Sequence, residues 1–428
     1  MATDVDVQYF SHLNGLVLGN NWGDLIRLLD KTLVTGIDLT QITAASIDAQ
    51  GDVYITLYAA HNAMLFQVVE LTGFTPTSLN QKYRIKGLPN TTQLILKPAL
   101  DIVERSISTS GAAKIASLGY EIVFRDSNDV KRVYRAKNPT AQHPFIRVDE
   151  SLTSPDGITG VYTSTYAKCA MVGLLEHMNH IDDFENPAVL QLPFDSADPA
   201  KNWNVKGAGS SCVRGWNKWY WATSETGVRN GGFYQNQVPS NGNRVFTLVG
   251  DSDAFYILMP GTLSSNKDYK LLYGIGLYDS SLAQDVVPAF FSMAQLNSVQ
   301  AGTQDAPPKG KSPLLYGDTE RKFIVPTHDT VIRLKNHVYC NPILLDNYTG
   351  MPSSPLNTAT LAALEIPMYD ENSILRGTLK HVCYAGNNLQ AKTVTTPIIA
   401  DNSLYIADSS LSYGNNLGGL YFYLGELE

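Results

Sequence analysis

The sequence predicts a mainly β protein, made of several small β-sandwich or β-barrel-like domains with one or two helices. Short runs of alternating apolar and polar residues recur along the chain, and clusters of Gly, Pro and Asn separate them. Only one stretch has clear helical spacing. At 428 residues the chain is too long for a single ordinary core, so two or three domains are expected.

Residues 66–96 give the clearest strand pattern. Three alternating runs occur there, at 67–71, 82–85 and 93–96. The intervening segments contain Gly73, Pro76 and Asn90, which supply the backbone angles of turns. This stretch is therefore expected to form a small meander with one apolar face, following a further strand at 52–58.

The helix candidate lies near the N-terminus. Apolar residues recur at helical spacing from Leu25 to Leu33, polar residues precede them, and Gly36 provides a stop. A second helix is expected over 98–106.

The β pattern continues from residue 120. Hairpins are expected over 121–137 and 243–260, a strand over 145–151, and an apolar strand at the C-terminal end. The stretch 166–178 fits either a helix or a buried strand. The predicted organisation is an N-terminal arm and helix (1–40), a small β domain (41–110), a central β-rich domain (111–300), a linker (301–312) and a C-terminal β-rich region (313–428).

Composition restricts the classes of partner. The net charge of −8 disfavours direct nucleic-acid binding, which needs clustered Lys and Arg. No apolar run is long enough to span a membrane, and the start lacks a secretion signal, so assembly in a reducing cytoplasm is expected. Only 17% of residues are charged, while 23 are Tyr, which suggests neutral surfaces that become buried between subunits. An ordinary protein with an uncharged polar surface would have the same composition.

The four cysteines, Cys169, Cys212, Cys340 and Cys383, lie far apart and form no CxxC pair. Buried free thiols are expected, because a disulfide framework is unusual in so long a chain with so few cysteines.

Motifs of catalysis or metal binding are weak. His177 and His180 lack the HExxH spacing of a zinc site, Gly207–Gly209 lacks the P-loop pattern, and the GKS at 310–312 is a chance match. Asp251, Asp253, Asp279 and Asp285 would suit a glycosidase only if two of them met in space. No catalytic residue, metal or cofactor is therefore predicted, and the chain is not expected to be an enzyme.

One aromatic cluster has three interpretations. It consists of Trp203, Trp216, Trp219, Tyr220 and Trp221, in a neighbourhood rich in Gly and Asn. It would serve as a hydrophobic core, as an anchor between subunits, or as a platform on which sugar rings stack.

Four phrases resemble a family of structural proteins of tailed-bacteriophage virions, associated with the tail, baseplate or neck. They are GFTPTSLNQKYRI (73–85), KRVYRAKNPTAQHPFIRVDES (131–151), RVFTLVGDSDAFYIL (244–258) and LAALEIPMYDENSILRGTLKHVCYA (361–385). The last phrase departs from the family pattern, because Lys380 and His381 stand where Pro-Gly is expected.

The resemblance implies a virion structural protein present in multiple copies, whose partners are copies of itself and other virion proteins. The N-terminal helix and the C-terminal strand are the expected contacts between subunits. Three alternatives stay open: a receptor- or carbohydrate-binding tail component that recognises a host-surface glycan, a capsid decoration protein, and a hydrolase of the cell envelope.

Overall fold

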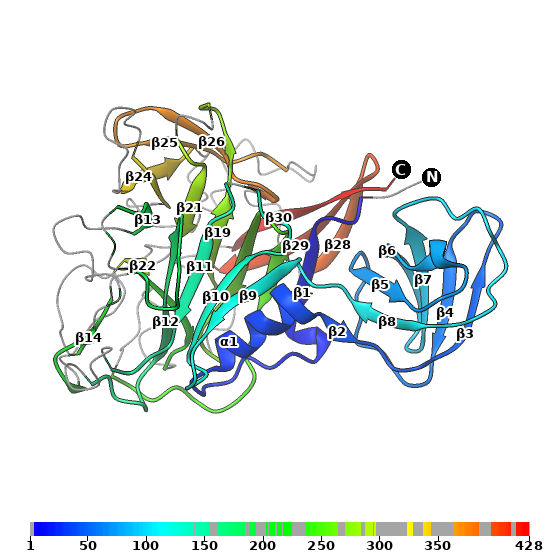
Figure 1. Ribbon diagram of the computed structural model, residues 1–428, viewed down its shortest axis with the longest axis horizontal. Coiled ribbons are helices and arrows are strands. Elements are labelled where there is room, and N and C mark those ends of the chain that lie inside the picture. Colours follow the sequence, from blue (N-terminus) through cyan, green and yellow to red (C-terminus); the bar gives the residue numbers. More distant parts are fainter. Residues whose placement is uncertain are drawn as a thin grey trace.

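A computed structural model gives the fold of the chain (Figure 1). It describes residues 4–140, 142–153, 161–184, 186, 188–193, 203, 205–209, 212–215, 217–224, 236–263, 270–283, 287–293, 295–296, 323–327, 337–343, 363–384, 395–411 and 417–427. Within these residues the architecture is mainly β with one α-helix, which confirms the predicted fold class. The predicted linker and the GKS fragment lie outside the described residues, and the predicted domain boundaries stay a prediction.

Residues 37–115 form the N-terminal sheet, which lies to one side of the rest of the molecule (Figure 1). Within the described residues its spatial order is β2 (Ile37–Asp38), β8 (Ala112–Ile115), β5 (Val68–Thr72), β6 (Lys82–Asn90), β7 (Gln93–Pro98), β4 (Val53–Leu57) and β3 (Ile42–Ile47). Strands β5, β6 and β7 are direct neighbours, so the predicted meander is confirmed. A short 3₁₀ turn, η3 (Thr77–Leu79), precedes β6.

The helix expected over 98–106 is wrong. Residues 99–107 are irregular, and the side chains of Leu100 and Val103 are 69% and 91% exposed. Only Ile102 of this stretch is buried. An isolated short helix needs an apolar face packed on a partner, and this segment has none.

Among the described residues, the three larger sheets that remain pack as layers, with the central sheet in the middle. Within the described residues the central sheet runs β1 (Gln8–Ser11), β17 (Thr247–Gly250), β18 (Ala254–Met259), β19 (Leu271–Leu277), β21 (Phe290–Met293), β23 (Phe323–Pro326), β24 (His337–Pro342), β25 (Pro367–Asp370), β26 (Leu375–Thr378) and β20 (Asp279–Ser280). The outer sheet runs β22 (Gln295–Leu296), β16 (Asn217–Ala222), β12 (Lys168–Leu175), β11 (Phe145–Asp149), β10 (Lys131–Ala136) and β9 (Tyr120–Arg125), with β13 (Gln191–Leu192) beside β12. The C-terminal sheet runs β27 (Val382–Tyr384), β30 (Leu417–Glu426), β29 (Ser403–Leu411) and β28 (Thr396–Ala400), and a separate ribbon pairs β14 (Val205–Lys206) with β15 (Val213–Arg214).

Alternation along β18 shows how the layers meet. Phe255 faces the outer sheet, where its ring lies 6.0 Å from that of Trp219. The next residue, Tyr256, belongs to the core shared with the C-terminal sheet, and its ring stacks on Phe291 at 5.7 Å. Successive side chains of a strand point to opposite faces. Since both faces of β18 are covered, by the outer and the C-terminal sheets, every residue of β18 is buried. The ambiguous stretch 166–178 resolves in the same way, as the fully buried strand β12.

The predicted N-terminal helix is confirmed as α1 (Asp24–Leu29), which continues into a π-helical segment, η2 (Asp30–Thr35), and ends at Gly36. Its first turn is capped by a distant side chain, since the Glu150 carboxylate accepts hydrogen bonds from the backbone N–H groups of Gly23 and Ile26. A carboxylate at a helix N-terminus satisfies free N–H groups and interacts favourably with the helix dipole.

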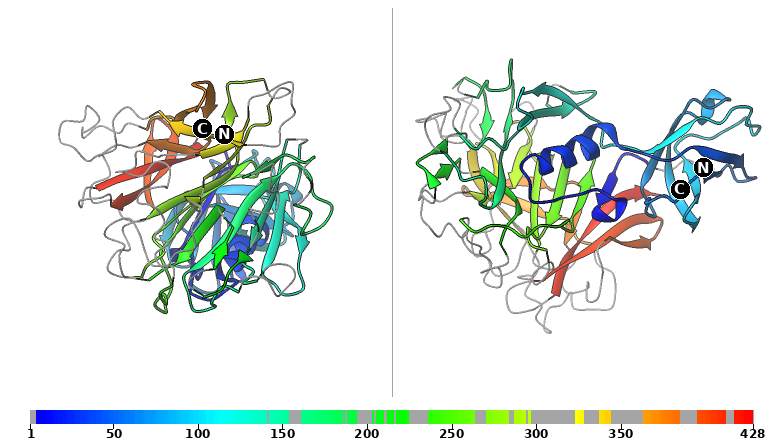
Figure 2. Two further views of the ribbon diagram at one scale, coloured as in Figure 1. Left: turned by 90° about the vertical axis from the view of Figure 1, so that its left-hand side faces the viewer. Right: turned by 90° about the horizontal axis from the view of Figure 1, so that it is seen from below.

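The N-terminal segment connects the N-terminal sheet to the layered body. Strand β1 pairs with β17 of the central sheet, while the Gln8 side-chain amide donates to the carbonyl oxygens of Val68 and Ala116. A short 3₁₀ turn, η1 (His12–Asn14), follows β1. The segment before β1 lies beside the end of β30, where the Asp4 N–H donates a hydrogen bond to the Glu426 carbonyl oxygen (Figure 2).

The cysteines are free thiols, as predicted. Cys169, Cys212 and Cys340 are buried, and Cys383 is partly buried. Within the described residues, no helix combines the length and the apolar composition needed to cross a membrane.

Candidate functional site at the junction of the sheets

The predicted aromatic cluster lies inside the protein. Trp219 and Trp221 of β16 and the neighbouring Tyr220 are buried, and so is Trp203. The Trp219 ring stacks on Tyr273 at 5.5 Å, and its indole N–H donates to a backbone carbonyl oxygen. Trp216 lies outside the described residues. Burial of the four described side chains favours the core interpretation, because a subunit anchor or a sugar platform needs an exposed ring.

Of the four aspartates considered for a glycosidase, three lie close together in the structure: Asp251, Asp253 and Asp279. Asp251 and Asp253 flank the tight turn between β17 and β18. The Asp251 carboxylate accepts hydrogen bonds from the backbone N–H groups of Asp253 and Ala254, at 2.8 and 3.0 Å, and this fixes the turn. Asp279 lies nearby at the start of β20, and Asp285 lies outside the described residues.

Each carboxylate of this turn has basic partners from other parts of the chain. The Asp253 carboxylate lies 2.8 Å from the His143 Nε2 and 2.6 Å from the Lys380 ammonium group. The Lys380 ammonium group also lies 3.5 Å from the Asp279 carboxylate. The Asp251 carboxylate lies 2.9 Å from the His381 Nε2.

These contacts join three sheets at one point. His143 precedes β11 of the outer sheet, the aspartates belong to the central sheet, and Lys380 and His381 form the turn between β26 and β27. That turn leads from the central sheet into the C-terminal sheet. We call these residues, His143, Asp251, Asp253, Asp279, Lys380 and His381, the junction cluster.

The junction cluster favours the charged forms of its carboxylates. The His143 hydrogen bond lowers the pKa of Asp253 well below its usual range, with a further lowering by Lys380 and only partial opposition from burial. Burial would raise the pKa of Asp251, but the His381 hydrogen bond and its charge outweigh it, and the net pKa is lowered. Burial likewise opposes the charge on Lys380, yet the Asp253 carboxylate raises the Lys380 pKa overall.

This electrostatic arrangement suits a cross-link better than acid catalysis. A glycosidase general acid needs a carboxyl group with a raised pKa, so that it still holds a proton near neutral pH. The pKa values of Asp251 and Asp253 are lowered instead. Their charges are used to hold the sheets together.

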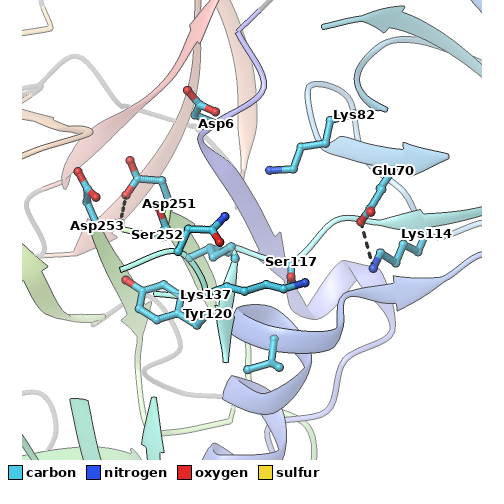
Figure 3. A pocket seen from close by; sticks show the side chains of 14 residues that line it. Asp6, Glu70, Lys82, Lys114, Ser117, Tyr120, Lys137, Asp251, Ser252 and Asp253 are labelled. Atoms are coloured by element: carbon cyan, nitrogen blue, oxygen red, sulfur yellow. Dashed lines mark hydrogen bonds and ion pairs between the residues drawn. The ribbon is translucent and has the colours of Figure 1, made fainter. Parts of the chain in front are cut away.

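A polar cleft of about 530 Å³ adjoins this turn, between the N-terminal sheet and the body (Figure 3). One wall is formed by Glu70, Lys82 and Lys114 of the N-terminal sheet. Opposite them lie Asp251, Ser252 and Asp253. The remaining lining is Asp6, Val34, Ser117, Leu118, Gly119, Tyr120, Lys137 and Asn138.

Charges on the walls of the cleft are only partly paired. Lys114 forms an ion pair with Glu70 at 3.0 Å. Among the described residues, the ammonium groups of Lys82 and Lys137 and the carboxylate of Asp6 have no ion-pair partner. Burial raises the pKa of Tyr120 well above its ordinary value, and the charges of Asp251 and Asp253 add to the shift.

The other sequence motifs stay apart from this site. His177 is exposed, and its Nε2 lies 3.1 Å from the Asn179 side chain. Asp182, close to His180 in sequence, pairs instead with Lys131 and Arg147. Gly207 and Gly209 belong to an irregular segment after β14. Within the described residues, no group of three or more metal-ligating side chains is placed to hold an ion.

Sequence reasoning missed the basic half of the junction cluster. Lys380 and His381 stood out only as a departure from the Pro-Gly of the resembled phrase, and His143 only as one residue of the phrase at 131–151. His143 and Lys380 lie 110 and 127 residues from Asp253 in sequence, so no local pattern links them. The signal that existed was the replacement of a turn-forming pair by two basic residues.

Comparison with known proteins identifies no family. No family model matches the sequence, and no curated protein matches it. Among solved structures, the chain has a weak similarity to a phage phi92 endosialidase, with 11% identity and a TM-score of 0.15. The alignment covers 92% of this chain and 51% of that one, so the chain spans about half the length of that structure. A similarity of this size supports no conclusion about fold or activity.

Proposed function

We propose that the chain is a structural protein of a tailed-phage particle, which assembles in multiple copies into the tail, baseplate or neck and acts by assembly rather than as an enzyme. The four resembling phrases support this proposal. So does the mainly β architecture, in which distant segments are cross-linked by polar contacts such as the junction cluster.

The observation that carries the proposal is the open edge of the N-terminal sheet. Among the described residues, β3 pairs only with β4, and its sequence, ITAASI, contains no charge and no proline. Free strand edges normally carry lysine or proline, because unpaired backbone groups recruit other strands. An uncharged edge is suited to strand pairing with a neighbouring subunit.

The contacts expected from the sequence are less suitable. The apolar side chains of α1 are buried inside the chain, and β30 is paired on both sides, with β27 and β29. Among the described residues, α1 thus offers no exposed apolar side chain and β30 no unpaired edge, so we propose β3 as the contact instead.

The proposal is tested first by composition of the particle. Mass spectrometry of purified virions from the phage that encodes the chain should detect it in multiple copies per particle. Its absence from purified virions would overturn the proposal.

A second experiment tests the edge strand. Sedimentation velocity of the purified chain should show association that increases with protein concentration. Ala44→Lys, which places a charge at an exposed position of β3, should shift the chain toward monomer. Ser127→Lys, in the exposed turn between β9 and β10, is the matched control and should associate like the wild type. A wild-type monomer over the whole concentration range would count against assembly through this edge.

A further inference from the structure

In the cleft beside the junction cluster, some of the charged side chains have no partner of opposite charge among the described residues. Asp251 is in contact with His381, and Asp253 is in contact with His143 and forms an ion pair with Lys380, so both carboxylates already have partners outside the cleft lining. Lys114 is likewise engaged by Glu70. Two ammonium groups, those of Lys82 and Lys137, thus remain without an ion-pair partner within the described lining, against one such carboxylate, that of Asp6 (Figure 3).

The rest of the lining selects among anionic ligands. Val34 and Leu118 are its only aliphatic members among the described residues, so a lipid or an apolar peptide would find little surface. The one aromatic side chain, Tyr120, is buried with its ring edge-on to Phe255 at 5.8 Å. A nucleobase would therefore find no ring on which to stack.

Hydroxyl and amide groups complete the lining. Ser117, Ser252 and Asn138 offer neutral donors and acceptors, and the Asp6 carboxylate is an acceptor. The hydroxyl of Tyr120, although buried, has no hydrogen-bond partner among the described residues. A volume of about 530 Å³ lies within the usual range for small-ligand sites, roughly 300–1,000 Å³.

We propose that this cleft binds an acidic saccharide. The ammonium groups of Lys82 and Lys137 contact the acidic group of the sugar, while Ser117, Ser252 and Asn138 hydrogen-bond its hydroxyl groups. This site differs from the predicted tryptophan platform in both place and chemistry. It goes beyond the assembly role, which does not depend on it.

Calorimetric titration of the full chain with tetragalacturonate tests the proposal, with neutral galactotetraose and inorganic phosphate as comparison ligands. Binding of tetragalacturonate is expected, weakened by added salt because the contact is ionic. Lys82→Gln and Lys137→Gln should each weaken it about tenfold, the effect of losing a hydrogen bond to a charged group. Lys31→Gln, at an exposed position of η2 outside the cleft, is the control and should bind like the wild type.

Each possible result of the titration either supports the proposal or overturns it. Absence of tetragalacturonate binding, equal binding of the neutral tetrasaccharide, or unchanged binding by both cleft variants would overturn the proposal. Phosphate binding as tight as that of the acidic saccharide would also overturn it, because the site would then recognise only a simple anion. Circular dichroism establishes that each variant is folded. None of these results alters the test for the chain in purified virions.

Discussion

The guanidinium group of Arg84 donates a hydrogen bond of 2.6 Å to the carbonyl oxygen of Leu424, 340 residues further along the chain. The same buried side chain donates to the carbonyl oxygens of Asp4, Val7 and Phe66. One residue of β6 thereby holds the N-terminal segment, the N-terminal sheet and the C-terminal strand together. Burial lowers the Arg84 pKa to about 10, which still leaves the group charged at neutral pH.

Arg84→Met should destabilise the protein by at least about 3 kcal/mol, because several buried carbonyl oxygens lose their donors. Denaturant unfolding followed by circular dichroism measures the loss. Arg125→Met is the matched control, since Arg125 is 56% exposed and lies 4.0 Å from its acidic partner. Equal stability of the two variants would show that the Arg84 contacts contribute little.

Because of the junction cluster, the free energy of unfolding should decrease at acidic pH. The Asp253 pKa is lower in the folded protein than its ordinary value of 3.8, so the folded state binds fewer protons at this group. Its stabilising contribution is complete above about pH 5 and is lost as the pH falls through 3.8 and below. Asp253→Asn should therefore lower the Tm at neutral pH, and the gap to wild type should narrow toward pH 3.

Thermal unfolding of both proteins across this pH range is the measurement. Asp38→Asn, at an exposed position of β2, provides the control and should follow the wild type throughout. A gap between Asp253→Asn and wild type that stays constant with pH would exclude the proposed linkage.

A buried ion pair between Lys270 and Asp408 connects the central and C-terminal layers. The Lys270 side chain is 3% exposed and the Asp408 side chain is fully buried, and Asp408 also accepts a hydrogen bond from Thr247. Lys270→Met should cost about 3–5 kcal/mol, because it leaves a carboxylate buried without its cation. Combining it with Asp408→Leu should cost clearly less than the sum of the two single changes.

A double-mutant cycle from denaturant unfolding tests this non-additivity. Strict additivity would mean that the two charges do not interact in the folded protein.

The distant cap of α1 makes a fourth prediction. Glu150→Ala removes the acceptor for the N–H groups of Gly23 and Ile26 and should cost about 1–2 kcal/mol. Glu121→Ala, at an exposed position of β9, should change stability by less than about 0.5 kcal/mol. Hydrogen exchange should locate the difference in α1. Unchanged exchange in α1 would show that the cap is dispensable.

The sequence correctly predicted those strands and turns that depend on residues close to one another in the chain. Strands β5 to β7 and the hairpin of β17 and β18 were predictable, because alternation and turn residues are local signals. Strand β12 remained ambiguous since it is buried on both faces and therefore lacks alternation. The helix expected over 98–106 failed because local spacing says nothing about whether a packing partner exists.

Such local signals could not predict contacts between residues that are far apart in the sequence. Only the folded chain brings His143 and Lys380 to Asp253, or Glu150 to the start of α1. The cleft could not be predicted for the same reason, because Lys82 begins β6 of the N-terminal sheet, Lys137 follows β10 of the outer sheet, and both look like ordinary surface lysines in sequence.

The free thiols described above report on the motions of individual sheets. Burial raises the pKa of Cys340 in β24 to about 12 and that of Cys383 in β27 to about 11. Since the thiolate is the form that reacts, alkylating reagents can modify the buried Cys340 near neutral pH mainly when the strands around it open. The labelling rate of Cys340 thus measures, without any engineered probe, how often the central sheet opens, and the partly buried Cys383 gives a second rate for comparison in the C-terminal sheet.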